Sequence, residues 1–340
     1  MTGRERFQKI LNRESDRCGF WHGDPNWASL DNIYSYFGVK DDFELGLKLG
    51  SGFRWVKTHE PGTWTNPDAP MFDFYGGVTK KSLGEGGVFA DYTDADIADV
   101  EGHYWPDVKY CDFTGAIAKM DETIEAGQGV VTGMWSCFFH DICEFFGMEN
   151  YFIKMHTDPD LVIAVTERVV DFYLQGNEKL FQAAGDRIDA FFFGNDFGSQ
   201  LDLLISPEHF DIFVMPYFRK LTDLAHKYGR KVLLHSCGAI NRVIPRLIGA
   251  GVEALHPIQA LARDMDAESL AKNYNGRIVF VGGVDTQLLL SGATPREVRD
   301  EVRRLKGLFG PNFVVSPSHE SILPNVPPEN ILAMAEAAAE

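Results

Sequence analysis

The 340-residue sequence predicts a (β/α)8 TIM barrel with N-terminal loop and hairpin elaborations, and three observations support this fold. From about Gly129 onward, short apolar runs rich in β-branched and aromatic residues alternate with longer helical patterns, as expected for parallel strands covered on both faces. About five or six such βα units follow one another, and one or two more are plausible near residues 18–21, which together indicate the eight units of a barrel. No Gly-x-Gly-x-x-Gly motif follows a strand and no Walker loop is present, so the main competitor, a doubly wound sheet, lacks its usual fingerprint.

The N-terminal third of the chain is less regular. Residues 1–9 are charged and indicate an amphipathic helix, without the apolar core of a signal peptide. Residues 18–21 fit a first strand. Residues 26–123 are rich in Gly, Pro, Trp and Asp and have poor periodicity, so we expect loops and hairpins attached to the barrel there.

The remaining strands and helices follow in a regular order. Helices are expected over residues 207–228 and 295–308, because Ser or Thr stands immediately before Pro at the first turn of each. We expect one domain over residues 1–340, with irregular elaborations in 1–125 and regular βα repeats in 126–340. The expected strands cover residues 130–134, 189–193, 231–234, 252–255, 277–281 and 312–315.

Composition narrows the classes of partner and compartment. The chain has 49 acidic and 32 basic residues and a formal net charge of −17, which disfavours nucleic acid and anionic membranes as partners. No run approaches the roughly 18 apolar residues of a membrane span. The five cysteines are odd in number and scattered, which favours a reducing cytoplasm over a disulfide framework. A homodimer is compatible with the sequence but is not indicated by it.

In a barrel of this kind, the carboxyl ends of the strands form the active face. The segments that follow five successive strands are polar, and they offer Asp, Gln, His, Cys and Glu side chains. We therefore expect a ring of polar groups above an apolar barrel. These segments are residues 194–200, 235–238, 256–259, 282–287 and 316–320.

The most specific of these segments is His235-Ser236-Cys237-Gly238, which ends an apolar run. Two side chains two residues apart can turn into one cleft, and imidazole with thiolate is a preferred ligand pair for zinc. The final segment is the best supplier of a third ligand, either His319 or Glu320, since zinc accepts nitrogen or a carboxylate oxygen. Three protein ligands would leave an open coordination position, as catalytic sites do.

Several further motifs stand along the chain: Gly3-Arg4-Glu5-Arg6-Phe7, Asp16-Arg17, Trp105-Pro106-Asp107, residues 196–200, 235–238 and 282–287, and Pro327-Pro328-Glu329-Asn330-Ile331. Together they resemble the uroporphyrinogen decarboxylase superfamily, and specifically its corrinoid-linked methyltransferase branch. The resemblance covers nearly the whole chain and implies a (β/α)8 barrel with zinc held by a His-x-Cys pair and a distant third Cys. The pair corresponds to His235 and Cys237, but no cysteine follows position 237.

The missing cysteine disfavours the thiol chemistry of the coenzyme M methyltransferases and leaves the third ligand open between His319 and Glu320. The decarboxylase itself is less expected, because its arginine-rich substrate motif would fall on residues 21–25, which contain no arginine. A porphyrinogen carries many carboxylates and needs fixed cations.

The resemblance thus implies a zinc-dependent methyltransferase that moves a methyl group between a small substrate and the cobalt of a separate corrinoid protein. A methoxylated, aromatic substrate is favoured, and cobalamin would arrive on the partner, because the chain has no cobalamin-binding motif of its own. The alternatives are a metal-free lyase acting on a carboxylated substrate and a non-catalytic binding protein.

Asp196 and Asp285 are the expected catalytic groups, although an Asp after a strand often caps a helix. The expected substrate-binding residues are Trp21, His22, Gln200, His256, Gln259 and Gln287.

Overall fold

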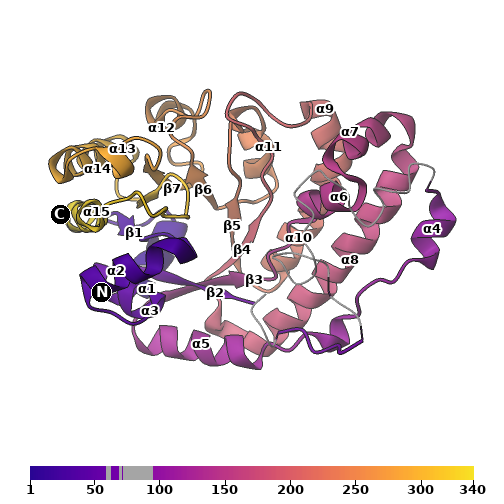
Figure 1. The fold of residues 1–340 in the computed structure, drawn as a ribbon, viewed down its shortest axis with the longest axis horizontal. Helices are drawn as coiled ribbons and strands as arrows, with labels where there is room; N and C mark the ends of the chain where they lie inside the picture. Colours follow the sequence, from indigo (N-terminus) through magenta and orange to yellow (C-terminus); the bar gives the residue numbers. More distant parts are fainter. Residues whose placement is uncertain (59–62, 69–70, 72–94) are drawn as a thin grey trace.

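The computed structural model describes residues 1–58, 63–68, 71 and 95–340, and eight parallel strands form its centre (Figure 1). Each strand from β2 to β8 pairs with the next one in the chain, and β8 also pairs with β1. This order confirms the predicted (β/α)8 barrel. The strands are β1 (Gly19–Phe20), β2 (Phe53–Lys57), β3 (Gly129–Gly133), β4 (Ala190–Gly194), β5 (Lys231–His235), β6 (Ala254–Ile258), β7 (Val279–Val284) and β8 (Phe313–Pro317).

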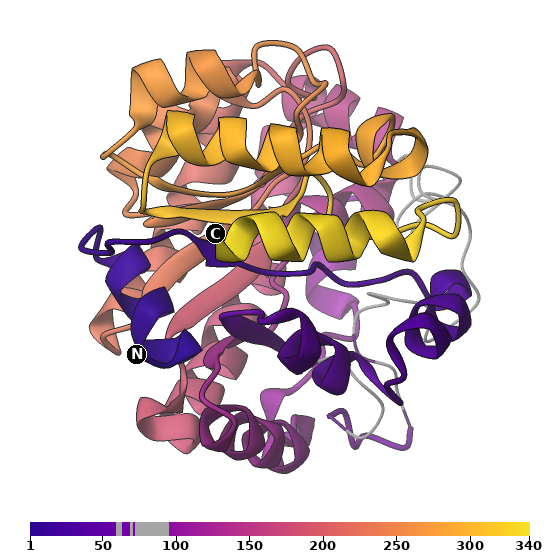
Figure 2. The same cartoon turned by 90° about the vertical axis from the view of Figure 1, so that its left-hand side faces the viewer.

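Helices surround this sheet, and Figure 2 shows α14 and α15 side by side on its outer face. The α-helices are α1 (Gly3–Leu11), α2 (Leu30–Phe37), α3 (Asp42–Leu49), α4 (Ile97–Gly102), α5 (Thr114–Glu125), α6 (Phe138–Phe146), α7 (Met148–Thr157), α8 (Pro159–Ala184), α9 (Pro207–His209), α10 (Met215–Lys227), α11 (Ile244–Gly249), α12 (Ala267–Tyr274), α13 (Leu289–Gly292), α14 (Pro295–Phe309) and α15 (Pro328–Ala339). Short turns are η1 (Trp27–Ser29), η2 (Val108–Tyr110), η3 (Gly185–Arg187), η4 (Phe210–Val214) and η5 (Asn241–Val243). None of the described helices is long and apolar enough to cross a membrane.

The barrel is least completely closed between β1 and β2. The two strands share no ladder in the described part of the chain, and the sheet order begins at one and ends at the other. A backbone hydrogen bond from the N–H of Gly52 to the carbonyl of Phe20, 2.8 Å long, bridges them instead. The segments around this seam, rather than a strand pair, therefore complete the barrel.

Two apolar layers hold the strands. Alternate side chains of each strand point in opposite directions, so one set fills the barrel and the other packs under the helices. Phe53, Val131, Phe192 and Leu233 belong to the inner layer and are almost completely buried. We call the end of the barrel formed by the carboxyl ends of the strands the mouth. The inner layer forms the floor of this mouth.

The expectation for residues 26–123 was wrong where the structure describes them. This stretch contains β2, a full member of the barrel, and helices α2 to α5. Strand β2 reads Phe-Arg-Trp-Val-Lys and is only partly buried, so it lacks the continuous apolar run that marks the other strands. The expected hairpins within residues 59–62, 69–70 and 72–94 lie outside the described residues.

The helix expected over residues 207–228 is interrupted. It consists of α9, the π-helical turn η4 and α10. Pro216 stands in the first turn of α10, and proline has no N–H and crowds the preceding carbonyls. The wider turn just before it accommodates this loss. The helix expected over 295–308 is confirmed as α14, with a capping box formed by Thr294 and Glu297.

Candidate metal centre

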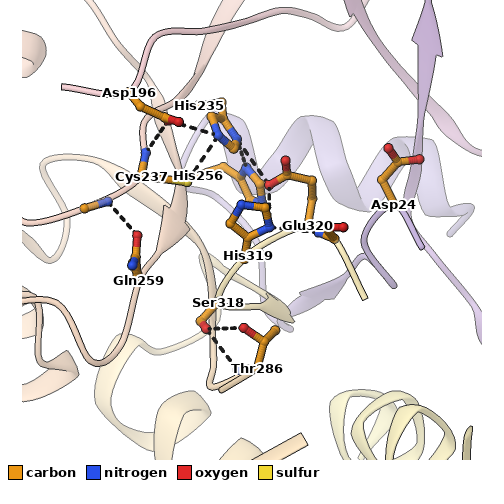
Figure 3. A network of polar contacts seen from close by, with 12 residues as sticks. Asp24, Asp196, His235, Cys237, His256, Gln259, Thr286, Ser318, His319 and Glu320 are labelled. Carbon is orange, nitrogen blue, oxygen red and sulfur yellow. Dashed lines mark hydrogen bonds and ion pairs between the residues drawn. The ribbon is translucent and has the colours of Figure 1, made fainter. Parts of the chain in front are cut away.

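His235, the last residue of β5, lies at the middle of a group of polar side chains at the mouth (Figure 3). Its Nε2 lies 3.4 Å from Cys237 Sγ and 3.3 Å from Asp196 Oδ1. Its Nδ1 lies 3.1 Å from His256 Nδ1 and 3.5 Å from Glu320 Oε2. Side chains from β6 and from the ends of β4, β5 and β8 therefore meet around one imidazole, as the position of the polar segments predicts.

The backbone places Cys237 beside this imidazole. Its N–H donates to Asp196 Oδ1 at 2.8 Å, which joins the ends of β4 and β5. The next residue, Gly238, has φ +86°, and a Cβ there would lie 2.2 Å from the carbonyl oxygen of Gly198. Only glycine permits this close approach of the two loops. The N–H of Gly238 donates to Gln259 Oε1 at 2.7 Å, which adds the end of β6.

The donor atoms on the Nε2 side suit a zinc ion. The candidate ligand atoms of Asp196, His235 and Cys237 all lie within 4.8 Å of one another. In a tetrahedral zinc site, bond lengths of about 2.0 to 2.3 Å place neighbouring ligand atoms roughly 3.3 to 3.6 Å apart. The separations of Cys237 Sγ and Asp196 Oδ1 from Nε2 match this value. A nitrogen, a sulfur and a carboxylate oxygen are also ligands that zinc accepts.

Glu320 lies on the opposite side of the ring. Its Oε2 is buried and makes no hydrogen bond in the described structure, although His235 Nδ1 is 3.5 Å away. Metal-bound histidines usually donate their second ring N–H to a carboxylate or carbonyl, and Glu320 stands where such an acceptor is needed. The other expected ligand, His319, accepts the N–H of Ser321 at its Nδ1, and its side chain is 42% exposed.

Burial and neighbouring charges shift the pKa values of these side chains in different directions. Burial is the largest influence on each member, and it raises the pKa of Cys237 to about 11 despite the opposing effect of His235. Burial also lowers the pKa of His256, and the charge of His235 lowers it further. For His235, the charge of Glu320 and its other acidic neighbours outweigh burial and raise the pKa. The pKa of Asp196 is lowered because the hydrogen bond and charge of His235 outweigh burial. Without metal, the positively charged imidazole of His235 thus lies between the carboxylates of Asp196 and Glu320. The position between these two carboxylates suits a cation.

The structure places the expected polar residues at different distances from this group. Gln259 adjoins it, because its Oε1 accepts the N–H of Gly238 next to Cys237, and its Nε2 donates to Gln200 Oε1 at 2.6 Å. Asp285 instead accepts the backbone N–H groups of residues 287, 288 and 289 and so caps a turn. No hydrogen bond or ion pair recorded for the described residues joins Asp285 or Gln287 to His235.

Trp21 and His22 diverge at the end of β1. Trp21 belongs to the inner layer, and its ring centroid lies 5.1 Å from that of His256, so it forms floor rather than wall. His22 faces the seam, where its Nδ1 lies 2.8 Å from Ser51 Oγ and its Nε2 lies 2.9 Å from Asp42 Oδ1. His22 therefore ties the end of β1 to α3.

Two tryptophans that the sequence interpretation missed line the mouth beside His235. The ring of Trp135 lies 5.4 Å from His235 and 4.8 Å from the ring of Trp55, measured between centroids. Lys57 Nζ lies 4.9 Å above Trp55 and forms an ion pair with Asp24 at 2.8 Å. Asp24, Trp55 and Lys57 also line a cavity of about 120 Å³. The expected substrate-binding residues Trp21 and His22 line the same cavity. An aromatic surface thus leads from the candidate metal ligands to a charged pair.

His140 was also missed, and it comes from α6, after β3. Its Nε2 lies 3.9 Å from Asp196 Oδ2, and burial lowers its pKa. The segment after β3 is largely apolar, so nothing in its sequence marked a polar member of the site. His140 thus adds a second imidazole beside Asp196 at the mouth.

Comparisons with known proteins agree with this architecture. The family model described as uroporphyrinogen decarboxylase (URO-D) matches residues 111–340, more than half of the chain. A methyltransferase from Methanosarcina mazei superposes with a TM-score of 0.60 and 17% identity, covering 100% of this chain and 98% of its own. A GH27 β-L-arabinopyranosidase from Geobacillus stearothermophilus gives a TM-score of 0.43 and 11% identity, covering 93% of this chain and 73% of its own, and supports no inference. No curated protein sequence matches the chain significantly.

Proposed function

The chain belongs to the uroporphyrinogen decarboxylase family, and on that premise we propose that it is a zinc-dependent methyltransferase. The methyl group would move between a small methylated substrate and the cobalt of a separate corrinoid protein. The observation that carries this proposal is the preformed cluster of Cys237, His235 and Asp196 at the mouth, with donor separations that suit zinc. The fold shared with the Methanosarcina mazei methyltransferase is consistent with it.

His235 and Cys237 would hold the metal, with a carboxylate as third ligand. Asp196 is the carboxylate that lies on the same side of the imidazole as Cys237, so we assign it as that ligand. Glu320 would accept the Nδ1–H of His235 and so fix the ring. When bound, zinc would act as a Lewis acid on the heteroatom that carries the methyl group.

The surrounding residues favour a methoxylated aromatic substrate. Trp135 and Trp55 would pack against a flat ring, and aromatic pairs of this kind are stabilising beyond their buried area. His235 and Cys237 are only 4% and 9% exposed, so a bound substrate would exclude water from the reacting bond. When that bond breaks, its electron pair stays on the oxygen, which then takes a proton. His140, which lies beside Asp196, would deliver this proton from solvent.

The mouth is a poor site for a porphyrinogen. Its described acidic side chains include Asp24, Asp196 and Glu320, which would repel a substrate rich in carboxylates. Lys57, the cation beside Trp55, is already paired with Asp24. These observations favour methyl transfer over decarboxylation of a tetrapyrrole.

The direct test measures methyl transfer to cob(I)alamin, free and bound to a corrinoid protein. Methoxylated aromatic compounds, methylamines and methyl thioethers would be offered as donors, and absorbance would follow the cobalt. We expect turnover with a methoxylated aromatic donor in the wild type and in Cys18→Ser, a cysteine outside the cluster, but at least a hundredfold loss in Cys237→Ser. Metal-independent turnover of uroporphyrinogen without methyl transfer would contradict the proposal.

A further inference from the structure

Five large apolar side chains are exposed around the mouth. Each lies in the loop that follows a different strand, after β1, β4, β6, β7 and β8 respectively. They therefore share one end of the barrel with His235, and we call them the mouth rim. Their exposed fractions are 83% for Trp27, 63% for Leu201, 47% for Leu261, 69% for Leu288 and 50% for Leu323.

Hydrogen bonds between neighbouring loops hold this rim together. The N–H of Asn26 donates to the carbonyl of Ile322 at 3.0 Å, which places Trp27 and Leu323 in adjoining loops. The N–H of Arg263 donates to the carbonyl of Gln200 at 3.0 Å, which does the same for Leu261 and Leu201. The loops after β7 and β8 are joined in turn, because the N–H of Thr286 donates to Ser318 Oγ at 3.1 Å (Figure 3). The rim is thus an ordered surface of linked loops.

Exposed large apolar side chains also occur elsewhere on the described surface, but the three most exposed of them, Trp27, Leu288 and Leu201, all belong to the mouth rim. Single exposed apolar residues are normal in soluble proteins, but tryptophan is highly buried on average and is enriched where partners bind most strongly. The five residues surround one opening, and the exposed ion pair of Asp202 and Arg242 lies beside Leu201. An apolar surface with polar groups at its edge is the usual composition of a protein interface.

We propose that the mouth rim docks the protein that carries the methyl acceptor, with Trp27 and Leu323 as its anchor. This inference rests on the proposed methyl transfer. The reacting centre is nearly inaccessible, since Cys237 is 9% exposed, so an acceptor has to enter through the mouth. A corrinoid held by a carrier protein can reach this centre only if the carrier seats over the opening. A carrier that seals the rim would also exclude water during transfer.

The test uses the double variant Trp27→Ala/Leu323→Ala, with Leu288→Ala as a second rim variant. Leu47→Ala is the matched control, because Leu47 is 41% exposed but lies in the last turn of α3, just before β2 begins at the opposite end of the barrel. Methyl transfer would be measured to free cob(I)alamin and to a corrinoid protein loaded with cob(I)alamin. We expect the KM for the corrinoid protein to rise about tenfold or more in the double variant, as loss of anchor residues produces. The kcat and the rate with free cob(I)alamin should stay unchanged.

Three results would overturn the docking surface. In the first, the double variant and Leu47→Ala have the same KM for the corrinoid protein. In the second, transfer to free and protein-bound cobalt falls equally, which places the defect inside the site. In the third, the double variant changes a dimer into a monomer by light scattering, which makes the rim a contact between copies of this chain. Absence of transfer by the wild type to either acceptor would instead refute the proposed function.

Discussion

His235 organises the candidate site because each of its ring nitrogens faces a different set of partners. Nε2 points to Cys237 and Asp196, and Nδ1 points to His256 and Glu320. A lone imidazole coordinates a metal through one nitrogen, so the two sides carry different roles. In the proposed metal centre, ligation would therefore belong to the side that holds the sulfur.

This division predicts different effects for the two carboxylates. Asp196→Ala should lose stoichiometric zinc, since it removes a ligand, whereas Glu320→Gln should weaken zinc affinity only about 10- to 100-fold, since it alters a partner of a ligand. Competition with a chelator of known affinity would measure both. If Glu320→Gln lost all zinc while Asp196→Ala kept it, Glu320 would be the third ligand, as one reading of the sequence suggested.

The sequence alone identified the site residues that directly follow a recognisable apolar strand. His235 and Cys237 follow an apolar strand directly, and Glu320 and Gln259 follow two others, so position marked them. Trp55 and Trp135 could not be found this way, because they become neighbours only when β2 and β3 pair. Aromatic residues are also common in cores, which hides a wall of this kind.

At the scale of elements, the end of β4 requires glycine because the ring of Trp135 packs directly against it. A Cβ on Gly194 would lie 2.3 Å from the ring of Trp135, so this side chain can occupy its place only above a residue without a Cβ. Gly194→Ala should therefore destabilise the protein by about 1 to 3 kcal/mol and disturb the tryptophan pair.

Gly307 provides the matched control within α14. Nothing lies within 4 Å of a Cβ at Gly307, and alanine is a better helix former, so Gly307→Ala should stabilise by up to about 1 kcal/mol. Urea unfolding of both variants would check the contrast. Equal stabilities of the two variants would show that Trp135 is not held against β4.

Strand prediction succeeded or failed according to burial. β5 was located almost to the residue, because it is nearly continuous in apolar residues. β2 was missed, since it lies at the seam, is partly exposed and carries Arg54 and Lys57. The π turn before Pro216 was missed for a different reason: caps mark where a helix begins, but not how its interior absorbs a proline.

For the molecule as a whole, one buried acid ties stability to pH. Asp141 is 5% exposed, accepts a hydrogen bond from Tyr173 OH at 2.8 Å, and has a pKa raised well above its usual value, chiefly by burial. An acid with a raised folded pKa favours the fold fully below its unfolded pKa of about 4. That contribution is lost as pH rises toward the folded pKa, because only the unfolded chain ionises freely.

Asp141→Asn should therefore gain melting temperature relative to the wild type as pH rises from 5 to 8, by about 2 °C or more. Asn keeps the shape and the acceptor for Tyr173 but cannot ionise. Calorimetry at both pH values would measure the difference. An identical difference at pH 5 and pH 8 would show that folding does not raise the pKa of Asp141.

The zinc content of the purified protein decides whether the mouth of the barrel holds a metal centre. Elemental mass spectrometry would be applied to freshly purified wild type, Cys237→Ser and the control Cys18→Ser. We predict about one zinc per chain in the wild type and control, and its loss in Cys237→Ser without a change in circular dichroism. A wild type without zinc, or a Cys237→Ser variant that keeps it, would contradict a metal centre at the mouth of this barrel.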